Sequence, residues 1–386
     1  MKALIHFPID RVAPTGGPAG YLYNLRQGLD EIDVRGIDFL PAAGAQMEKN
    51  ALLRKVTPDR VKDLRRARNF MALPTKSLPA PVGYSAYDAI HFHSTEDLYV
   101  RRGALESYRG KVLLTSHSPL VYHKELIGRL NPRDAKRHTE KLANLEVIDR
   151  YAFERADIVV FPCPEAEEPY FHTWGAYPEV RDEAKLRYLP TGIRGCAAKA
   201  SRGEVRARYG IPGDAFLMCY VGRHNSVKGY DALVEATLPM LDDPNVWMLV
   251  AGKQGPLFAP EHSRWVEAGW TDDPHSLIAA ADVFVLPNKE TYFDLVLLEV
   301  LSLGTPLVAT RTGGNRYFDG LSEGIVLCEG AGNFAAGVRR VREAGVAGRV
   351  AMAEANRRLF AKRFTCGEFA RSYYELLEAV TDGGVR

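Results

Sequence analysis

Short apolar segments rich in β-branched residues alternate along this chain with longer segments that have the period of an amphipathic helix. The strand candidates of the first half are "KALIHF", "GIDFLP", "DAIHFHS", "KVLLTSHS" and "ADIVVFPC", and those of the second half are "FLMCYVGR", "NVWMLVAGK", "ADVFVLPN", "TPLVATRT" and "GIVLCE". Several are apolar at successive positions, which is typical of strands buried on both faces of a parallel sheet. Helical patterns lie between them, at 17–32, 228–241, 293–303 and 333–344. This alternation predicts an α/β fold with doubly wound parallel sheets.

The number of strand candidates indicates two domains. Roughly ten parallel strands are too many for one open sheet but suit two sheets of about five or six. The chain has 386 residues, which is enough for about two domains. A divide falls at 190–212, where the sequence is rich in Gly, Ala and charged residues and has no strand pattern before Phe216. We therefore expect two Rossmann-like domains that face each other across a cleft.

Charge and cysteine content narrow the class of protein. The formal net charge is +2, so whole-chain charge gives no argument for nucleic-acid binding. The odd number of cysteines, widely spread and without a CxxC motif, indicates buried thiols in a reducing compartment. They are Cys163, Cys196, Cys219, Cys328 and Cys366.

The N-terminal segment "MKALIHFPIDRV" predicts a first strand rather than a signal peptide, because its apolar run is short and is broken by His6 and Pro8. No stretch approaches the ~18 apolar residues that a membrane-spanning helix needs. We expect a cytoplasmic protein.

One segment is strongly basic. Residues 54–76 hold eight Lys or Arg against two Asp, and Val61, Leu64, Ala67 and Met71 fall on one helical face. The pattern indicates a solvated surface helix packed on its sheet. The alternative is contact with an anionic membrane surface or with a phosphorylated acceptor.

Ligands of parallel α/β sheets bind outside the carboxyl ends of the strands, where helix N-termini point amides at anions. The first such turn, Thr15-Gly16-Gly17, follows the first strand and opens a helix. Its glycines let the backbone approach a phosphate or sugar closely, although a plain tight turn explains them equally well. The turn is not GxGxxG, so the dinucleotide fingerprint is absent.

Three histidines lie in or just after two of the strand candidates. His117, in "LLTSHSPLVYH", lies just past a strand end, either as a polar group facing the cleft or as a structural, hydrogen-bonded histidine. His91 and His93 share one face of a strand. Two histidines at this spacing could hold a metal ion, but no Cys, Asp or Glu cluster accompanies them, and we expect no metal.

The turn "VGRHNSVKGYDAL" carries two cations between a strand and a helix that is predicted to begin near Lys228. Gly222 and Arg223 end the strand. Arg223, through its planar fork, and Lys228, as a compact charge beside the helix N-terminus, suit a pyrophosphate. Surface basic residues on a loop are the alternative interpretation.

The segment "FDLVLLEVLSLGTPLVATRTGGN" places one acid, Glu299, in an apolar helical run. A carboxylate with apolar neighbours needs a partner, because leaving it unpaired costs several kcal/mol. The partner could be a structural Arg or a ligand diol such as ribose hydroxyls. Asp294 lies at the expected helix start, and we expect it to be a structural residue that caps the helix. Gly313-Gly314 follows the next strand and offers amides and close approach.

Together these turns describe a cleft for a nucleotide diphosphate that carries a polyol. Arg223 and Lys228 would neutralise the pyrophosphate without metal, Glu299 would hold ribose, and the glycine turns would lie near the sugar and phosphates. The chemistry that this favours is glycosyl transfer from a nucleotide-sugar.

In these segments the sequence resembles retaining glycosyltransferase family 4, the GT-B family that contains phosphatidylinositol mannosyltransferases and bacterial capsule and lipopolysaccharide transferases. The matching pieces keep the family's order over most of the chain. They are "TGGPAGYLYNL", "DAIHFHS", "TSHS", "ADIVVFPC", "LPTGI", "VGRHNSVKG", "AADVFVLPN", "FDLVLLEVLSLGTPLVAT" and "TGG".

The resemblance implies a division of labour between two domains. An acceptor-binding domain would span 1–192, a donor-binding domain 193–366, and the C-terminal helix 367–386 would join the first. His117 would lie beside the donor sugar, and Glu299 would be the ribose-binding acid. Leu295 and Val296 would belong to the donor-binding segment.

The sequence departs from the family at two positions. The family has two glutamates eight residues apart, yet eight residues before Glu299 stands Thr291, and the nearest acid is Glu290. Either Thr291 replaces the acid with a hydroxyl, or a one-residue shift brings Glu290 into the role. The family's usual glycine before "LVLLE" is Asp294 here. The favoured front-face mechanism of retaining GT-B enzymes needs no carboxylate nucleophile, only positioning and support for the leaving nucleotide.

We expect a metal-independent, retaining glycosyltransferase that uses a UDP-hexose, with a GDP-hexose as the next candidate. The acceptor stays open between a glycan, a lipid-linked molecule, a protein and a natural product. The alternatives are a nucleotide-sugar 2-epimerase of the same fold and a non-catalytic partner subunit that binds sugar nucleotides. The missing GxGxxG disfavours a nicotinamide dehydrogenase.

Overall fold

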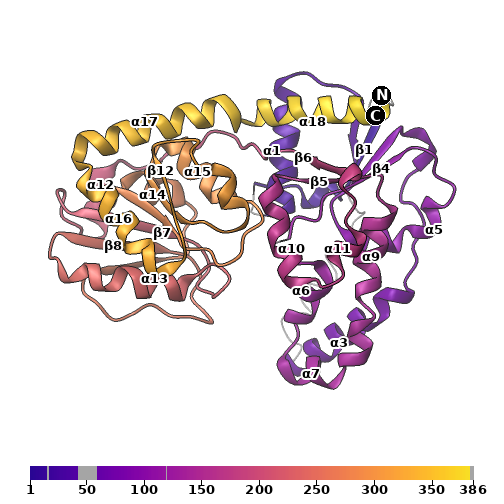
Figure 1. Ribbon diagram of the computed structural model, residues 1–386, viewed down its shortest axis with the longest axis horizontal. Coiled ribbons are helices and arrows are strands. Elements are labelled where there is room, and N and C mark those ends of the chain that lie inside the picture. Colours follow the sequence, from indigo (N-terminus) through magenta and orange to yellow (C-terminus); the bar gives the residue numbers. More distant parts are fainter. Residues whose placement is uncertain (15–16, 42–58, 119, 383–386) are drawn as a thin grey trace. The chain divides into compact units, whose positions relative to one another are not determined.

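The computed structural model describes residues 1–14, 17–41, 59–118 and 120–382, and the chain divides into two compact units (Figure 1). Unit 1 comprises Met1–Phe161, Glu168–Leu189 and Ala370–Arg386. Unit 2 comprises Pro162–Glu167 and Pro190–Phe369. Each unit is built around one parallel sheet, which confirms the predicted α/β class.

In its described part, unit 1 has a six-stranded sheet in the order β2-β1-β3-β4-β5-β6, parallel throughout. Its strands are β1 (Ala3–His6), β2 (Ile37–Phe39), β3 (Ala89–Phe92), β4 (Lys111–Leu114), β5 (Ile158–Phe161) and β6 (Leu186–Tyr188). The five predicted strands are confirmed. β6 escapes prediction because it is only three residues long and ends on an exposed residue, so no apolar run marks it.

The helices of unit 1 are mostly short. They are α1 (Pro18–Glu31), α3 (Asp59–Ala72), α4 (Thr95–Val100), α5 (Arg102–Leu105), α6 (Tyr122–Gly128), α7 (Pro132–Arg137), α8 (Thr139–Ala143), α9 (Glu146–Arg155), α10 (Glu168–Thr173) and α11 (Tyr177–Val180).

The described part of the basic segment forms α3 and a 3₁₀ turn (Leu73–Thr75), and α3 packs on other helices rather than on its sheet. Ala67 is buried in a cluster with Leu126 and Leu142 of α6 and α8, and Met71 packs against the same cluster. The side chains of Val61 and Leu64 lie outside the described residues. None of the described helices is long and apolar enough to span a membrane.

Unit 2 also contains a six-stranded parallel sheet within the described ranges, in the order β12-β11-β10-β7-β8-β9. Its strands are β7 (Phe216–Val221), β8 (Val246–Ala251), β9 (Trp265–Gly269), β10 (Val283–Leu286), β11 (Leu307–Thr310) and β12 (Ile325–Cys328). The five predicted strands are again confirmed. β9 escapes prediction because it is an edge strand that buries one residue fully and carries Glu267 near its middle.

The helices of unit 2 cover both faces of its sheet. They are α12 (Arg202–Arg208), α13 (Tyr230–Thr237), α14 (Pro274–Ala280), α15 (Leu295–Leu303), α16 (Phe334–Glu343) and α17 (Gly345–Arg363). α13 and α16 share a core with every second residue of the strands, whereas α14 and α15 pack on the other side, where α17 lies along α15 (Figure 1).

The helix predicted to begin near Lys228 begins at Tyr230, because Gly229 takes a left-handed conformation with φ 68° as its N-cap. It continues from Leu238 to Asp242 as a 3₁₀ helix. Pro239 lies in this extension and removes a backbone donor.

The final helix, α18 (Cys366–Thr381), begins in unit 2, and from Ala370 onward it belongs to unit 1. Its apolar residues Phe369, Tyr373, Leu377 and Val380 are buried, with Tyr373 and Leu377 fully inaccessible. Tyr373 donates or accepts a 2.9 Å hydrogen bond with Nδ1 of His91, inside unit 1.

The segment 190–212, predicted to lack strands, contains the helix α12. Ser201 caps it with Glu204 in a reciprocal capping box, because Ser201 Oγ accepts from Glu204 N and the Glu204 carboxylate accepts from Ser201 N. Ser-x-x-Glu is a sequence signal for a helix start, so this helix could have been predicted.

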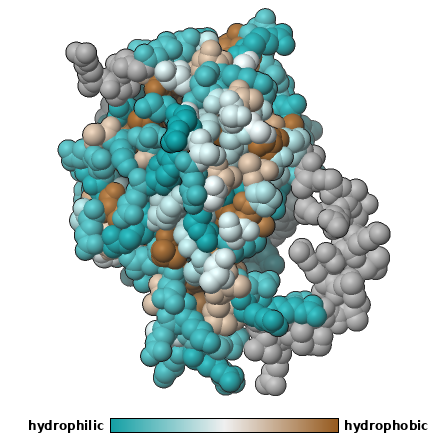
Figure 2. All heavy atoms as spheres, turned by 90° about the vertical axis from the view of Figure 1, so that its right-hand side faces the viewer, coloured by the Kyte–Doolittle hydropathy of each residue, from teal (hydrophilic) through white to brown (hydrophobic). Residues whose placement is uncertain are grey.

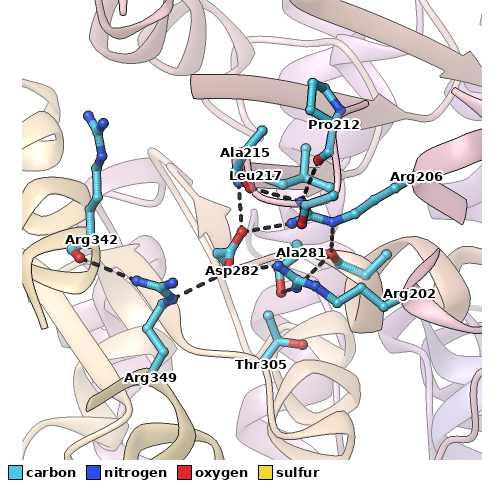
Figure 3. Close-up of polar contacts among 12 residues, drawn as sticks. Arg202, Arg206, Pro212, Ala215, Leu217, Ala281, Asp282, Thr305, Arg342 and Arg349 are labelled. Atoms are coloured by element: carbon cyan, nitrogen blue, oxygen red, sulfur yellow. Dashed lines mark hydrogen bonds and ion pairs between the residues drawn. The ribbon is translucent and has the colours of Figure 1, made fainter. Parts of the chain in front are cut away.

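Asp282, immediately before β10, fixes α12 to the sheet of unit 2 (Figure 3). Its Oδ2 accepts hydrogen bonds of 2.8 Å from Arg206 Nη2 and from Leu217 N of β7. Its Oδ1 accepts from Arg202 Nη2 at 2.9 Å and lies 3.3 Å from Arg349 Nε. One buried carboxylate therefore joins α12, β7 and α17.

We predict that Asp282→Ala lowers the stability of unit 2 by about 3–5 kcal/mol, because it leaves the buried Arg206 guanidinium without its counter-ion. The matched control is Asp319→Ala, which removes a half-exposed partner of Arg311 and should cost no more than about 1 kcal/mol. Calorimetry of the purified variants gives both values. Equal losses for the two variants would contradict the role of Asp282.

Candidate functional site

The loops that follow β7, β10 and β11 meet at one edge of the sheet in unit 2, because these strands are neighbours and parallel. Lys289 N donates to Val227 O at 3.1 Å, which joins the β10 loop to the β7 loop. Thr312 Oγ1 donates to Lys289 O at 3.0 Å, which joins the β11 loop to the β10 loop. The three loops thus form one connected surface.

Glycines let these loops come into backbone contact. A Cβ at Gly229 would lie 1.7 Å from Pro287 O, and one at Gly313, whose φ is 44°, would lie 2.1 Å from Thr291 O. Gly314 N donates to Thr291 O at 3.2 Å. The expectation that Gly313-Gly314 presents amides to a ligand is therefore wrong for the Gly314 amide, because this turn approaches the backbone of the β10 loop.

Lys228 forms an ion pair inside this surface. Its Nζ lies 2.5 Å from Asp294 Oδ2, and Asn288 Nδ2 donates to the same oxygen at 2.7 Å. Burial raises the pKa of Asp294, but the Lys228 ammonium, the Asn288 amide and the positive charge of Arg223 outweigh it and hold the pKa below its usual range. Asp294 is therefore an anion.

Asp294 occupies the N-cap position of α15, but its side chain makes no cap hydrogen bond. The expectation of a helix cap is therefore wrong, because the carboxylate turns to Lys228 instead of to the backbone of the helix. The amino-acid sequence was not enough to identify Lys228 as the partner of Asp294. A signal for the pair was that Asp294 lies in the loop after one strand candidate, while two cations lie in the loop after another.

Arg223 is exposed, and its guanidinium has no ion pair or hydrogen bond within the described ranges. Its main chain is fixed, since Tyr220 Oη donates to Arg223 O at 3.1 Å. A Cβ at Gly222 would lie 2.6 Å from the same Tyr220 oxygen, so a side chain there would displace that hydroxyl. The two predicted cations therefore differ, because Lys228 carries a counter-ion and Arg223 does not.

Glu299, in α15, has a histidine as its partner and not the arginine that the sequence left open. His275 Nε2, at the start of α14, lies 3.6 Å from Glu299 Oε2, with side chains 31% and 29% exposed. His275 also makes a side-chain hydrogen bond with Cys196; this bond and the Glu299 carboxylate raise the pKa of His275 to about 10. The pair is therefore imidazolium and carboxylate at neutral pH. Nothing in the sequence pointed to His275.

The segment between β10 and α15 contains both candidates for the missing family glutamate. Thr291 is 3% exposed, and Glu290 is half-buried. Leu295 and Val296, the first residues of α15, are also half-buried.

In unit 1 the candidate residues lie at the ends of β3 and β4. His117 follows β4 with a left-handed φ of 61°, a conformation that is strained for a residue with a Cβ and is common at functional sites. Its ring lies 4.6 Å from that of Tyr21 in α1 and 5.1 Å from that of His93. Gly16 lies outside the described residues, and Gly17 is the N-cap of α1 with φ 72°.

His93 Nδ1 and His117 Nε2 are 2.8 Å apart, so one ring must donate and the other accept. His93 Nε2 is buried without a hydrogen-bond partner within the described ranges, and a buried N–H that donates to nothing is costly. The arrangement therefore favours a proton on His93 Nδ1, which donates to His117 Nε2. His117 then carries its own proton on Nδ1 as a neutral donor.

His91 lies beside His93, as predicted, with ring centroids 4.2 Å apart. Its two nitrogens bond to Tyr373 Oη and Thr115 Oγ1, each at 2.9 Å. Within the described residues, no group of three or more His, Cys, Asp or Glu side chains is arranged to hold a metal ion.

Residues 215–343 match the family model described as glycosyl transferases group 1. The D-inositol 3-phosphate glycosyltransferase of Corynebacterium efficiens is 29% identical over 250 residues, which cover 59% of this chain and 56% of that protein. The lipopolysaccharide core biosynthesis glycosyltransferase LpsE of Rhizobium meliloti is 30% identical over 182 residues, 45% of this chain and 52% of that protein. The chain thus spans about half the length of these relatives.

Two solved structures share the fold over nearly the whole chain. Sucrose-phosphate synthase from Thermosynechococcus elongatus has a TM-score of 0.68 at 20% identity and covers 99% of this chain and 100% of its own. Anabaena Alr3699/HepE in complex with UDP-glucose has a TM-score of 0.63 at 15% identity, with 98% of this chain and 100% of its own covered. The fold is therefore the two-domain, Rossmann-like GT-B fold.

We predict that the histidine pair makes unit 1 acid-sensitive. Burial lowers the pKa of His117 to about 3 and that of His93 well below its usual value. The unfolded value is about 6.5, so the stabilising contribution is complete above about pH 6.5 and is lost as the pH falls below it. Below about pH 6.5, each of the two histidines should lower the free energy of unfolding by about 1.4 kcal/mol per pH unit.

The measurement is thermal unfolding at pH 7.5 and pH 5 of wild type and of His93→Gln/His117→Gln. The double variant should lose less stability on acidification than wild type. The exposed His172 provides the control, His172→Gln, which should keep the wild-type pH dependence. Parallel pH profiles for all three proteins would contradict the prediction.

Proposed function

The chain belongs to the group 1, family 4 type of glycosyltransferases with the GT-B fold, and from this premise we propose that it is a retaining enzyme. It moves a hexosyl group from a nucleotide-diphosphate sugar to an acceptor hydroxyl. UDP-sugars are the favoured donors and GDP-sugars the next. The complex of UDP-glucose with the similarly folded HepE supports this order.

One observation carries the proposal: two cations and one aspartate lie on a connected set of loops at the carboxyl ends of β7, β10 and β11. Arg223, Lys228 and the ionised Asp294 together carry one net positive charge, and the exposed guanidinium can fork two phosphate oxygens. A pyrophosphate would then share Lys228 with Asp294. In this proposal the two cations take the place of a divalent ion.

The chain's own groups would act by position and by charge. Arg223 and Lys228 would stabilise the charge that develops on the leaving diphosphate. Glu299 would accept from the ribose hydroxyls, with His275 holding one carboxylate oxygen. His117 would donate from Nδ1 to a sugar oxygen. A phosphate oxygen of the donor would assist the attacking hydroxyl, so no protein nucleophile is needed.

The first domain would bind the acceptor, which is a glycan, a lipid-linked molecule, a protein or a natural product. Peripheral contact with an anionic membrane through 54–76 is part of the same proposal. Arg65, Arg66 and Arg68 are exposed on α3, and the lower end of Figure 2, where α3 and α7 lie in Figure 1, is mostly hydrophilic. Arg66 also donates to Arg129 O at 3.0 Å. A cytoplasmic location fits the free cysteines.

Two other functions remain on this scaffold. Two observations support a non-catalytic subunit that binds sugar nucleotides as the alternative. They are the loss of the first family glutamate and the counter-ion on Lys228. A nucleotide-sugar 2-epimerase would need acids and histidines around the sugar. Release of UDP or GDP from a labelled donor, even slow hydrolysis, distinguishes an enzyme from the binding subunit.

We predict that UDP raises the melting temperature more than GDP and ADP do, and that a UDP-sugar then turns over. A ligand at about 100 times its Kd stabilises by about 2.7 kcal/mol. Differential scanning fluorimetry with each nucleotide, followed by an assay of nucleotide release, measures both. A protein that none of these nucleotides or sugars stabilises would overturn the proposed donor class.

The clamp itself is tested with Lys228→Met, which should abolish nucleotide stabilisation and turnover. The matched control is Lys289→Met. Lys289 also pairs with an aspartate, since its Nζ lies 2.5 Å from Asp231 Oδ2, but its side chain is 47% exposed. The control should keep both properties. Near-normal rates for Lys228→Met would refute the phosphate assignment.

The register of the donor-sugar contact gives a further prediction. If Thr291 takes the place of the family glutamate, Thr291→Val should lower kcat/KM by about 10-fold or more, as the loss of a hydrogen bond to a substrate hydroxyl does. Glu290→Gln should then change it little. The opposite ranking in steady-state kinetics would show that Glu290 holds the role.

A further inference from the structure

The residue after Arg223 is fixed on two sides. His224 is fully buried, and its ring stacks on that of Tyr230, the first residue of α13, with centroids 3.9 Å apart and 10° between the planes. Its main chain is held as well, because His224 N donates to Lys253 O at 3.2 Å and His224 O accepts from Leu257 N at 3.1 Å. The loop after β7 is therefore clasped at His224 by α13 and by the loop after β8.

Glu267, in the edge strand β9, orients the ring on which His224 stacks. Its Oε1 accepts hydrogen bonds of 3.0 Å from Tyr230 Oη and 2.8 Å from Trp265 Nε1. Burial and the Glu267 carboxylate raise the pKa of the Tyr230 hydroxyl, so the phenol remains a donor. Tyr230 and Trp265 are 1% and 6% exposed, and hydrogen bonds shielded from water in this way are strong. One carboxylate thus sets the orientation of the stacked pair.

The second oxygen of Glu267 faces the His224 ring without bonding to it. Glu267 Oε2 lies 3.7 Å from His224 Nε2, which is too long for a hydrogen bond. This oxygen and both ring nitrogens of His224 are buried without a hydrogen-bond partner within the described ranges. Burial outweighs the carboxylate and lowers the pKa of His224, so the ring is neutral at neutral pH. Unpartnered buried polar atoms cost free energy and call for an explanation. The explanation offered by the geometry is that His224 acts through the face of its ring.

This arrangement matters for Arg223, whose exposed side chain makes no hydrogen bond or ion pair of its own within the described ranges. The place of its guanidinium therefore depends on the main chain beside it. We propose that Glu267 is a positioning residue for Arg223. Its carboxylate fixes the Tyr230 ring, that ring fixes His224 by stacking, and the main chain next to His224 carries Arg223.

The consequence for binding rests on the proposed function, in which Arg223 binds the diphosphate of the donor. A loop that is already fixed in its binding geometry loses less conformational entropy when the ligand arrives, so the ligand binds more tightly. Glu267 itself is held by Tyr230 and Trp265 and would act on the nucleotide only through Arg223.

The first arm of the test examines the loop without nucleotide. Hydrogen exchange of the folded full-length chain, read by mass spectrometry, reports the amides of His224 and Leu257. Glu267→Ala should speed exchange in peptides that contain these amides by about tenfold, because the loop opens more often. Glu267→Gln should keep the wild-type rate, since an amide oxygen accepts the same two hydrogen bonds. The control is Glu235→Ala, which removes an exposed acid of α13 and should change nothing. Unchanged exchange in Glu267→Ala would overturn the positioning role.

The second arm is a double-mutant cycle on the Kd of UDP. Arg223→Met should weaken binding by about tenfold, as the loss of a charged hydrogen-bond donor does. Glu267→Ala should weaken it by about fivefold when Arg223 is present and by less than about twofold in Arg223→Met, because the two residues act in series. Glu267→Gln should restore the wild-type Kd. An acid that only stabilises the fold would give equal losses in both backgrounds, and that result would contradict the proposal.

Substitutions of His224 provide a second route if Glu267→Ala does not fold. His224→Phe keeps an aromatic ring to stack on Tyr230 and removes the unpartnered nitrogens, so it should keep the Kd of UDP. His224→Ala removes the ring and should weaken binding about as much as Glu267→Ala. Equal Kd values for the two variants would show that the stack positions nothing.

The two arms separate this inference from the proposed function. If wild type does not bind UDP, or if Arg223→Met leaves the Kd unchanged, the phosphate role of Arg223 fails and the effect on binding fails with it. The exchange rates still decide whether Glu267 holds the loop. If Arg223→Met weakens binding but Glu267→Ala does not, the positioning role is refuted and the phosphate role stands.

Discussion

The ion pair between Lys228 and Asp294 joins the loop after β7 to the loop after β10, and the candidate site of unit 2 is organised around it. Its geometry depends on backbone approaches that only glycine permits, above all that of Gly229 to the Pro287 carbonyl. The pair also sets the charge of the surface. Asp294 compensates part of the charge of Lys228, whereas the exposed Arg223 has no counter-ion among the described residues and can fork an anion.

Histidines in the two units show how neighbours decide charge. His91, His93 and His117 are packed against one another and against Tyr21 and Tyr373. Burial and mutual repulsion keep them neutral, and two of them are joined by one hydrogen bond that requires a neutral acceptor. His275 lies between a thiol and a carboxylate and is protonated. The same side chain therefore serves as a neutral donor in unit 1 and as a cation in unit 2.

The cluster around Asp282 has a different task. It places no group at the carboxyl ends of the strands, but it fixes α12 and with it the end of the 190–201 segment. That segment is tied to two helices, because Cys196 N donates to Ser302 Oγ of α15 and Lys199 N donates to Ser276 Oγ of α14. The ion cluster and these two serines thus connect the framework of unit 2 to the helices that carry Glu299 and His275.

The parallel sheets, most of their strands and the turns that hold the candidate residues could be predicted from the amino-acid sequence, because strand burial and helix period are local patterns along the chain. It missed β6 and β9, which are short or half-exposed and leave no apolar run. Arg223, Lys228 and His117 were recognisable from their place after a strand, and Glu299 as the one acid in an apolar helical run. Their partners were decided only by the tertiary structure. Asp294, His275 and His93 meet them from other strand ends or helices, and pairing across such distances in the chain follows from strand order and from close backbone approach, which no short stretch of sequence encodes.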